Sequence, residues 1–502
     1  MSMIRHFLRC RSVLSGTLFA VMVGVGTAGV VGCASNSATG DDVFAPFMSE
    51  AEEKKVGKEE HPKVLAEFGG AYNHPELQRY VSSIGNFLKS TTPQANEPYT
   101  FTVLDSDMVN AFALPGGYVY VTRGLMALAN DEAEFAGVVG HEIGHVVARH
   151  TAQRYSQGVI AGLGAAILGA ITKSDIVGNV AQMGAAAYVQ GFSRDQELEA
   201  DQLGVQYLTR AGFHPMAMAS FLGSMEAESA LALKKAGKEG TDPAASLFSS
   251  HPRTADRIVA AAQSAAANAS GPIARDQDVY FRKINGMIYG DSPEQGYVRG
   301  RNFSHPKLKF SFDAPPGFAM QNSQAAVIGR AKGGSAMLQF DGGKMSSAQR
   351  SLATYVKNDW APNIGLGNVE TFTVNGMEAA TGRANVRLDN GPAELRLVAI
   401  RYSGAQVYRF LFIGAPNIPQ NVDEQFRETV YSFRKLSDRE AAALKPRILS
   451  VVTVKSGDTA QSLAKRMAVD DYPLETFLTL NGLKSGQALQ PGRKVKLVAW
   501  GK

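Results

Sequence analysis

Residues 131–149 have the sequence DEAEFAGVVGHEIGHVVAR. Their apolar side chains recur at intervals of three and four, which predicts a buried amphipathic helix. His141 and His145 are four residues apart, so on a helix both project from one face and can reach the same metal ion. Glu142 stands beside the first histidine, where it can take a proton from an attacking water. The stretch therefore favours a hydrolytic metal centre over a core helix that carries two hydrogen-bonded histidines.

A catalytic zinc site needs three protein ligands and one position left for water. The metzincin pattern H-E-x-x-H-x-x-G-x-x-H is excluded, because Ala148 and Thr151 stand where it requires glycine and histidine. His150 is about 180° round the helix from His141, which predicts a structural role for His150. The third ligand must then come from another segment.

An acidic segment at 193–201, SRDQELEAD, also predicts a helix and offers candidate ligands. Glu197 and Asp201 are four residues apart on one face, so one can bind the metal while the other holds a ligand histidine by its second ring nitrogen. Glu199 lies about 200° round the helix from Glu197. Spacing alone does not decide between Glu197 and Glu199 as the third ligand.

The order of these motifs resembles the gluzincin family of HtpX, the CAAX prenyl proteases and the periplasmic BepA-like proteases. HEIGH and SRDQELEAD match H-E-x-x-H and S-R-x-x-E-x-x-A-D of that family. Further matches lie at 110–125 (NAFALPGGYVYVTRGL), 131–136 (DEAEFA) and 251–257 (HPRTADR). The resemblance implies a zincin-type protease domain, mainly helical with a small β-sheet, which we place at residues 49–268.

The same resemblance implies the composition of the site. One Zn²⁺ ion is expected on His141, His145 and Glu197, with Asp201 behind a ligand histidine and Glu142 as the general base. A metallopeptidase of this kind needs no nucleophilic serine or cysteine.

Residues 110–122 predict a pair of strands that turn at 115–117. In relatives, the edge of this small sheet binds the substrate backbone, and an edge strand does offer unpaired N–H and C=O groups to an extended peptide. An ordinary buried hairpin is the alternative. The residues expected along the substrate are Asn110, Ala111, Phe112, Pro115 and Gly116.

His251 opens the HPRTADR motif. In BepA-like relatives this histidine can approach the zinc as a fourth ligand and hold the enzyme inactive, and stabilisation of an oxyanion is a second possible role. A loop histidine without either role is the alternative.

The N-terminus predicts export. Residues 1–32 have a basic start followed by an apolar run, which is typical of a secretory signal. The sequence VVGC resembles a bacterial lipobox, which would make lipidated Cys33 the first mature residue, and Ala34 after it favours the outer membrane, facing the periplasm. An uncleaved membrane anchor is the alternative. Residues 33–48 predict a flexible tether.

Net charge argues against nucleic acid as a partner. Loss of residues 1–32 removes three arginines and no acid, so the net charge falls from +5 to +2. That balance is close to neutral for a chain of this size and leaves only a mild attraction to anionic envelope polymers.

Two segments of the protease domain have ambiguous patterns. Residues 155–172 are uncharged and long enough to span a membrane, but their glycine and alanine content favours a packed helical pair or a lid near the membrane surface. Residues 215–238 predict a helical hairpin.

Beyond residue 276 the pattern changes to strands. Residues 276–438 predict a β-rich α+β domain, in which 395–402 and 407–413 form a hairpin and a helix at 423–433 closes the unit. The domain has no metal or catalytic constellation in its sequence, and substrate selection or partner docking is the expected role.

Residues 449–499 resemble a LysM module, a βααβ unit. Three stretches match the LysM pattern in its order, namely TVKSGDT at 453–459, FLTLNGL at 477–483 and LQPGRKVKL at 489–497. The resemblance implies that peptidoglycan or another N-acetylglucosamine polymer is the ligand, and a degenerate module without sugar binding is the alternative.

The sequence thus predicts an α+β multidomain zinc endopeptidase of the gluzincin type, tethered in the bacterial envelope, which hydrolyses polypeptides that are misfolded or misassembled there. A chaperone or assembly factor with a silenced or structural zinc site is the second hypothesis. A wall-remodelling hydrolase is a third and weaker one.

Overall fold

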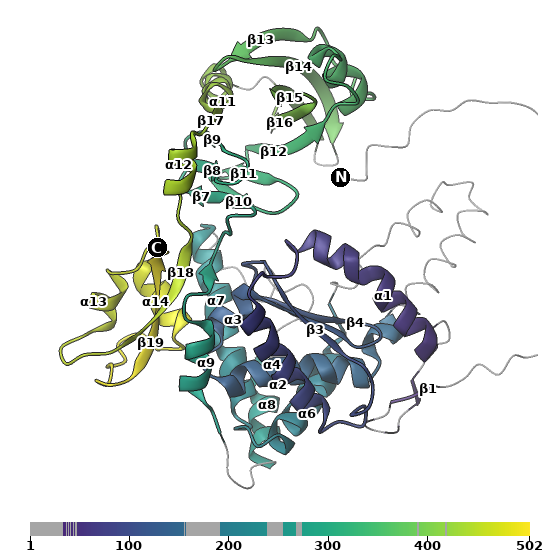
Figure 1. The fold of residues 1–502 in the computed structure, drawn as a ribbon, viewed down its shortest axis with the longest axis vertical. Coiled ribbons are helices and arrows are strands. Elements are labelled where there is room, and N and C mark those ends of the chain that lie inside the picture. Colours follow the sequence, from purple (N-terminus) through teal and green to yellow (C-terminus); the bar gives the residue numbers. More distant parts are fainter. Residues whose placement is uncertain are drawn as a thin grey trace, which may run out of the picture. The chain divides into compact units, whose positions relative to one another are not determined.

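The computed structural model describes residues 48–154, 156, 191–237, 255–267, 274–388, 391–416 and 419–501, with scattered positions from 34 to 45 (Figure 1). The chain divides into two compact units. The larger contains 33–339 and 421–502, and the smaller contains 340–420. The signal segment 1–32, Cys33, nearly all of 155–172 and His251 lie outside the described residues. Helices and antiparallel sheets occur in both sequence halves, so the predicted α+β class is confirmed.

Helices dominate the first half of the larger unit. They are α1 (Glu50–Glu67), α2 (Pro75–Lys89), α3 (Arg123–Leu128), α4 (Glu132–Val147), α6 (Arg194–Arg210), α7 (Ala217–Lys235), α8 (Ala255–Ala267) and α9 (Gln277–Ile284). None of the described helices combines the length and the apolar character needed to cross a bilayer.

Helix α4 lies at the centre, and all of its 16 residues are buried. It begins where the Asp131 side chain accepts a hydrogen bond from Glu134 N at 2.8 Å. It ends at Val147, because Arg149 adopts a left-handed backbone with φ of 57° and turns the chain away. The predicted helix is therefore confirmed.

Small residues let α6 cross α4 closely. A Cβ added at Gly204 would lie 3.0 Å from His141 N, and one at Gly144 would lie 3.1 Å from Ala200 O. Side chains at these positions would push the helices apart. The glycines of HEIGH and of α6 therefore bring the acidic residues of α6 to the histidines of α4.

The small sheet beside α4 contains β3 (Thr100–Leu104), β4 (Ala111–Leu114) and β5 (Tyr118–Thr122) in the order β3-β5-β4. Strands β4 and β5 are antiparallel and form the predicted hairpin, while β3 runs parallel to β5. Gly116 and Gly117 turn it with φ of 78° and 83°. Since β4 has a strand on one side only, it is an edge of this sheet.

Residues 217–235 form one straight run, α7, so the predicted helical hairpin at 215–238 is wrong. Gly223 was the only residue inside the run that could favour a break, and a single glycine is tolerated within a helix. Buried residues along α7, among them Met218, Phe221 and Leu222, anchor it in the core.

Short strands follow in the larger unit. They are β6 (Ile288–Tyr289), β7 (Tyr297–Arg299), β8 (Asn302–His305), β9 (Phe310–Asp313), β10 (Phe318–Asn322), β11 (Val327–Ala331) and β17 (Arg434–Lys435). Strands β17, β9, β8 and β7 form one antiparallel sheet in that order. Helix α12 (Asp438–Ala443) leads to the C-terminal module.

The C-terminal module has the predicted βααβ order: β18 (Arg447–Thr453), α13 (Ala460–Ala464), α14 (Pro473–Leu480) and β19 (Lys494–Trp500). Strands β18 and β19 pair antiparallel, and β18 also pairs with β6. The module shares one hydrophobic core with α2, α4 and α7. Lys496 is fully buried there and donates to the carbonyl oxygens of Ala127, Leu128 and Ala129 at 2.6–3.1 Å.

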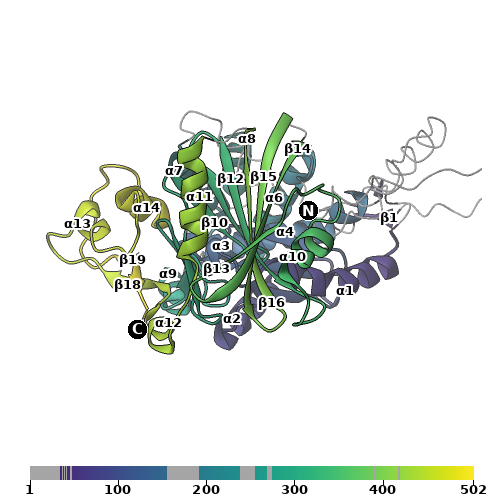
Figure 2. The same cartoon turned by 90° about the horizontal axis from the view of Figure 1, so that it is seen from above.

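The smaller unit is built on antiparallel strands, which Figure 2 shows from above. Strand β12 (Ala336–Lys344) enters it, followed by α10 (Leu352–Thr354), a π-helical turn (Tyr355–Trp360), β13 (Glu370–Val374), β14 (Met377–Leu388), β15 (Gly391–Ser403) and β16 (Gln406–Gly414). Strands β13 to β16 pair in sequence order. The predicted hairpin is β15–β16. The predicted helix is α11 (Gln420–Ser432), which belongs to the larger unit from residue 421 onward.

Candidate metal centre

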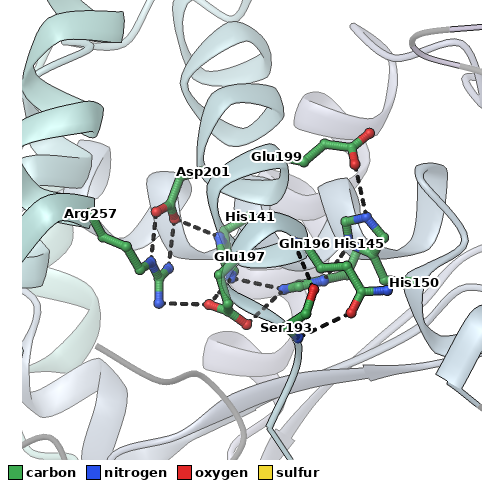
Figure 3. A network of polar contacts seen from close by, with 9 residues as sticks. All are labelled: His141, His145, His150, Ser193, Gln196, Glu197, Glu199, Asp201 and Arg257. Atoms are coloured by element: carbon green, nitrogen blue, oxygen red, sulfur yellow. Dashed lines mark hydrogen bonds and ion pairs between the residues drawn. The ribbon is translucent and has the colours of Figure 1, made fainter. Parts of the chain in front are cut away.

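Helices α4 and α6 bring together His141, His145 and Glu197 (Figure 3). The two Nε2 atoms are 3.0 Å apart, His141 Nε2 is 3.7 Å from Glu197 Oε2, and His145 Nε2 is 3.5 Å from Glu197 Oε1. All three side chains are buried. In the described part of the chain, this is the group whose ligand atoms lie close enough to share one metal ion.

The three residues fit a tetrahedral metal site. Ligand bonds of about 2.0–2.2 Å place tetrahedral donor atoms about 3.3 Å apart, close to the separations between these donor atoms. Two imidazole nitrogens and one carboxylate form a donor set suited to zinc and related divalent ions.

Glu199, the alternative third ligand, points elsewhere. Its Oε2 lies 3.2 Å from His150 Nε2, and its Oε1 accepts from Asn36 Nδ2 at 2.6 Å. Of the two glutamates that spacing left open, the structure brings only Glu197 to the histidine pair. Asn36, within the segment expected to be a tether, is itself buried.

Asp201 lies behind the first histidine, as the i, i+4 spacing with Glu197 suggests. Its Oδ1 is 2.9 Å from His141 Nδ1. Burial alone would raise the pKa of Asp201, but hydrogen bonds from Arg257 and His141 outweigh burial and lower it. The carboxylate therefore stays ionised and fixes the orientation of the imidazole ring.

Arg257 of α8 is a residue to which the sequence gave no role. Its Nε and Nη2 donate to the two oxygens of Asp201 at 2.7 Å each, and its Nη1 lies 2.6 Å from Glu197 Oε2. The guanidinium is buried. Arg257 is the last residue of the HPRTADR motif, and its place in that motif was the available signal.

His150 is nearer to the site than the helical count suggested. Its Nδ1 is 2.9 Å from His145 Nδ1, so it contacts a candidate ligand without being one. The predicted position, half a turn away, is wrong because α4 ends at Val147 and the chain turns back at Arg149. The Glu53 carboxylate stabilises that turn by accepting a hydrogen bond from Arg149 Nε at 2.7 Å.

The residues expected along the substrate separate into two groups. Asn110 and Ala111 line a cavity with His141 and Glu142. The cavity has about 390 Å³ of empty space, part of it open to solvent. The other three lie away from it.

Phe112 stacks on Tyr120, with ring centroids 4.9 Å apart. The turn at Pro115 and Gly116 packs on α1, where a Cβ at Gly116 would meet Lys54 Cα at 2.8 Å. These residues therefore support the strand instead of lining the site.

Comparison with known proteins agrees with this geometry. Residues 73–265 match the sequence profile of Peptidase family M48. The chain contains a family M48 peptidase domain. Residues 452–498 match the LysM domain. Both resemblances that the motifs suggested are thus confirmed, and α2 to α8 belong to the M48 domain.

Named relatives are similar to part of this chain. The "Beta-barrel assembly-enhancing protease" of Yersinia pestis is 30% identical over 43% of this chain and 45% of its own length. The protein of that name in Escherichia coli K12 is 36% identical over 30% of this chain and 33% of its own length. "Metalloprotease LoiP" of Escherichia coli K12 is 27% identical over 44% of this chain and 83% of its own length. The chain thus spans less than half the length of the first two relatives.

Proposed function

We propose that this protein is a zinc-dependent endopeptidase of the gluzincin type that acts on misfolded or misassembled proteins of the bacterial envelope. The observation that carries the proposal is the buried group of His141, His145 and Glu197 beside Glu142 and a cavity, within an M48 domain. A protein that only holds peptides would have no need of Glu142 next to such a group.

Zn²⁺ on His141, His145 and Glu197 would supply a Lewis acid that polarises the scissile carbonyl and makes water a stronger acid. Glu142 takes the proton of the attacking water and then delivers it to the leaving amine. Because Glu142 is 2% exposed, it exchanges that proton in a site from which bulk water is largely excluded.

The substrate backbone would pair with β4. Ala111 is the first residue of this edge strand and also lines the cavity, so a peptide added to the strand would pass over Glu142. Backbone pairing is independent of side chains, which suits an enzyme that degrades many unfolded chains.

His251 is proposed to regulate the site, either as a fourth ligand that silences the enzyme or as a donor to the oxyanion. The variant His251→Ala separates the two roles by cleavage rate. A faster variant indicates inhibition by His251, and a slower variant with full zinc content indicates assistance.

For location, we propose an outer-membrane lipoprotein anchored through Cys33, facing the periplasm, with the LysM domain bound to peptidoglycan. The names of the relatives support an envelope role, and the LysM match supports binding to an N-acetylglucosamine polymer. Labelling with a palmitate analogue in cells, lost in Cys33→Ala, tests the anchor. Sedimentation with purified peptidoglycan tests the LysM domain.

A second candidate function is assembly of outer-membrane proteins without proteolysis. It rests on the words "assembly-enhancing" in the relatives' names. Cells that carry Glu142→Gln distinguish the two functions. Normal outer-membrane assembly in such cells would favour the chaperone role, and defective assembly would favour the peptidase.

A further inference from the structure

The N-terminal segment, residues 34–48, packs on the domain beside the metal centre. Its first described residues form two short strands, β1 (Ala34–Ser35) and β2 (Asp42–Val43), which pair antiparallel. Further along, Ala45 and Met48 are buried in one apolar cluster with Ala152, just beyond the end of α4. Where the sequence predicted a flexible tether, the segment is therefore attached to the domain at several points.

Asn36 makes a polar contact between this segment and α6. Its side chain is 4% exposed, and its Nδ2 donates to Glu199 Oε1 at 2.6 Å. The Oδ1 atom accepts from Ala38 N at 2.9 Å, which holds the donor end of the amide toward the carboxylate. A buried amide is costly unless it is hydrogen-bonded, and apolar contacts alone would be enough to attach the segment. The amide therefore points to a role beyond attachment.

The other oxygen of Glu199 faces the metal centre through His150 (Figure 3). Glu199 Oε2 lies 3.2 Å from His150 Nε2, and His150 Nδ1 lies 2.9 Å from His145 Nδ1. The Nε2 atom of His145 is the one that faces His141 and Glu197. One ring nitrogen of His145 is thus directed at the metal position, and the other is directed at His150.

The donor and acceptor roles along this chain of contacts follow from metal binding. A neutral imidazole has one N–H group, so metal binding through Nε2 leaves the proton of His145 on Nδ1. His150 must then accept at Nδ1, keep its own proton on Nε2 and donate it to the Glu199 carboxylate. Phe192 stacks on the His145 ring with centroids 3.9 Å apart, which fixes the ring plane but does not select the nitrogen that binds the metal. That selection depends on the hydrogen bonds from His145 to Glu199.

We propose that Asn36, Glu199 and His150 are positioning residues for the metal ligand His145, and that the N-terminal segment is therefore a functional part of the metal centre. Asn36 holds the Glu199 carboxylate in the orientation in which it accepts from His150. The centre reaches its full metal affinity only when the N-terminal segment is attached. The inference rests on the proposed zinc peptidase, but it concerns metal binding, which is measured without a substrate.

The first readout is the zinc affinity of the full chain in detergent, measured by competition with a chromogenic chelator. Glu199→Gln should weaken zinc binding about tenfold, and Asn36→Ala, one contact further from the metal, at least about threefold. Asn86→Ala is the matched control, since Asn86 is exposed on α2 and its Nδ2 donates to Ser82 O of the same helix. It should bind zinc as the wild type does. Wild-type zinc affinity in Asn36→Ala would overturn the role of the N-terminal segment.

An exchange of donor and acceptor separates positioning from a general loss of packing. In Asn36→Asp two carboxylates face each other, and in Glu199→Gln two amide groups do, so each variant should bind zinc more weakly. The double variant Asn36→Asp, Glu199→Gln restores an amide–carboxylate pair, and the oxygen of its new amide still accepts from His150. It should bind zinc more tightly than either single variant. Losses that add in the double variant would contradict the proposal.

The visible absorption of Co²⁺ bound in place of zinc adds a readout that unfolding cannot imitate. Its bands depend on the geometry of the ligands, and only folded, metal-loaded molecules contribute to them. Asn36→Ala and Glu199→Gln should shift these bands, and Asn86→Ala should not. Identical bands in all variants would show that His145 is oriented without the N-terminal segment. A wild-type chain that shows these metal-binding effects but leaves unfolded casein intact would contradict the peptidase function and support the positioning role.

Discussion

Arg257 binds Asp201 through two parallel hydrogen bonds of 2.7 Å, although the residues are 56 positions apart and lie on different helices. Asp201 in turn lies 2.9 Å from the Nδ1 atom of His141. The three residues form a chain that fixes the ring of a candidate metal ligand, and loss of such a supporting contact typically weakens metal binding by about 10- to 100-fold.

Arg257→Lys should weaken zinc binding by about 10- to 100-fold, because lysine keeps the charge but not the two-pronged geometry. Competition with a chromogenic chelator measures the affinity independently of catalysis. Arg194→Lys is the matched control, since Arg194 bridges the same two helices through an exposed ion pair with Asp256. If both variants hold zinc equally well, the orienting role of Arg257 is wrong.

Gly204→Ala should destabilise the fold by about 1–3 kcal/mol, because the new methyl group would lie 3.0 Å from His141 N and overpack the crossing of α4 and α6. Zinc affinity should fall as well. Gly223→Ala on α7 meets no atom within 4 Å and should be neutral or stabilising by up to about 1 kcal/mol. Urea unfolding measures both, and a stabilised Gly204→Ala would contradict the close crossing.

His305 should make the larger unit less stable in acid. Burial lowers the pKa of His305 to about 4. The unfolded chain, with a histidine pKa near 6.5, then binds more protons than the folded chain between these values. Stability is therefore lost as the pH falls from about 6.5 to about 4, by up to about 3 kcal/mol.

The variant His305→Asn isolates this effect. An asparagine oxygen can accept the hydrogen bond that Leu308 N donates to His305 Nδ1 at 3.2 Å, but it does not titrate in this range. Unfolding by urea at several pH values should show a smaller acid loss for the variant. Parallel curves for the two proteins would show that His305 contributes nothing to acid sensitivity.

Lys496→Met should lower the free energy of unfolding by about 1–3 kcal/mol. Burial lowers the pKa of Lys496 to about 7, while Glu134 and Asp131 act to raise it. Its amino group satisfies three carbonyl oxygens at the end of α3, and methionine cannot. Lys484→Met, at an exposed site of the same module, should have no such effect. Equal stability of the two variants would show that the module docks without Lys496.

The local parts of the site were accessible from the sequence. The i, i+4 spacing of His141 and His145 needs only a helix, and the apolar periodicity around them predicts one. The choice of Glu197 over Glu199 needed the structure or the family, because it depends on how α6 crosses α4. That crossing depends on Gly204 and Gly144, whose role is invisible without the partner helix.

The positions of His150 and Lys496 could not be predicted for the same reason, because both depend on contacts between segments far apart in the sequence. His150 was misplaced because the end of α4 depends on Arg149, whose left-handed backbone is held by a distant glutamate, Glu53. Lys496 is typical of an exposed strand residue in sequence, and only the packing of the LysM domain on α3 buries it. Contacts between segments far apart in the sequence leave no periodic pattern from which they could be predicted.

The central claim is that Glu142 is the general base of a zinc peptidase. The most direct test is digestion of an unfolded outer-membrane protein by the zinc-loaded full chain, compared with Glu142→Gln and with Glu226→Gln at an exposed position of α7. The account predicts that Glu142→Gln keeps one zinc ion per chain and loses at least about 10²-fold in rate, while Glu226→Gln is unchanged. Cleavage by Glu142→Gln at the wild-type rate, or an intact substrate after incubation with fully zinc-loaded wild type, would contradict it.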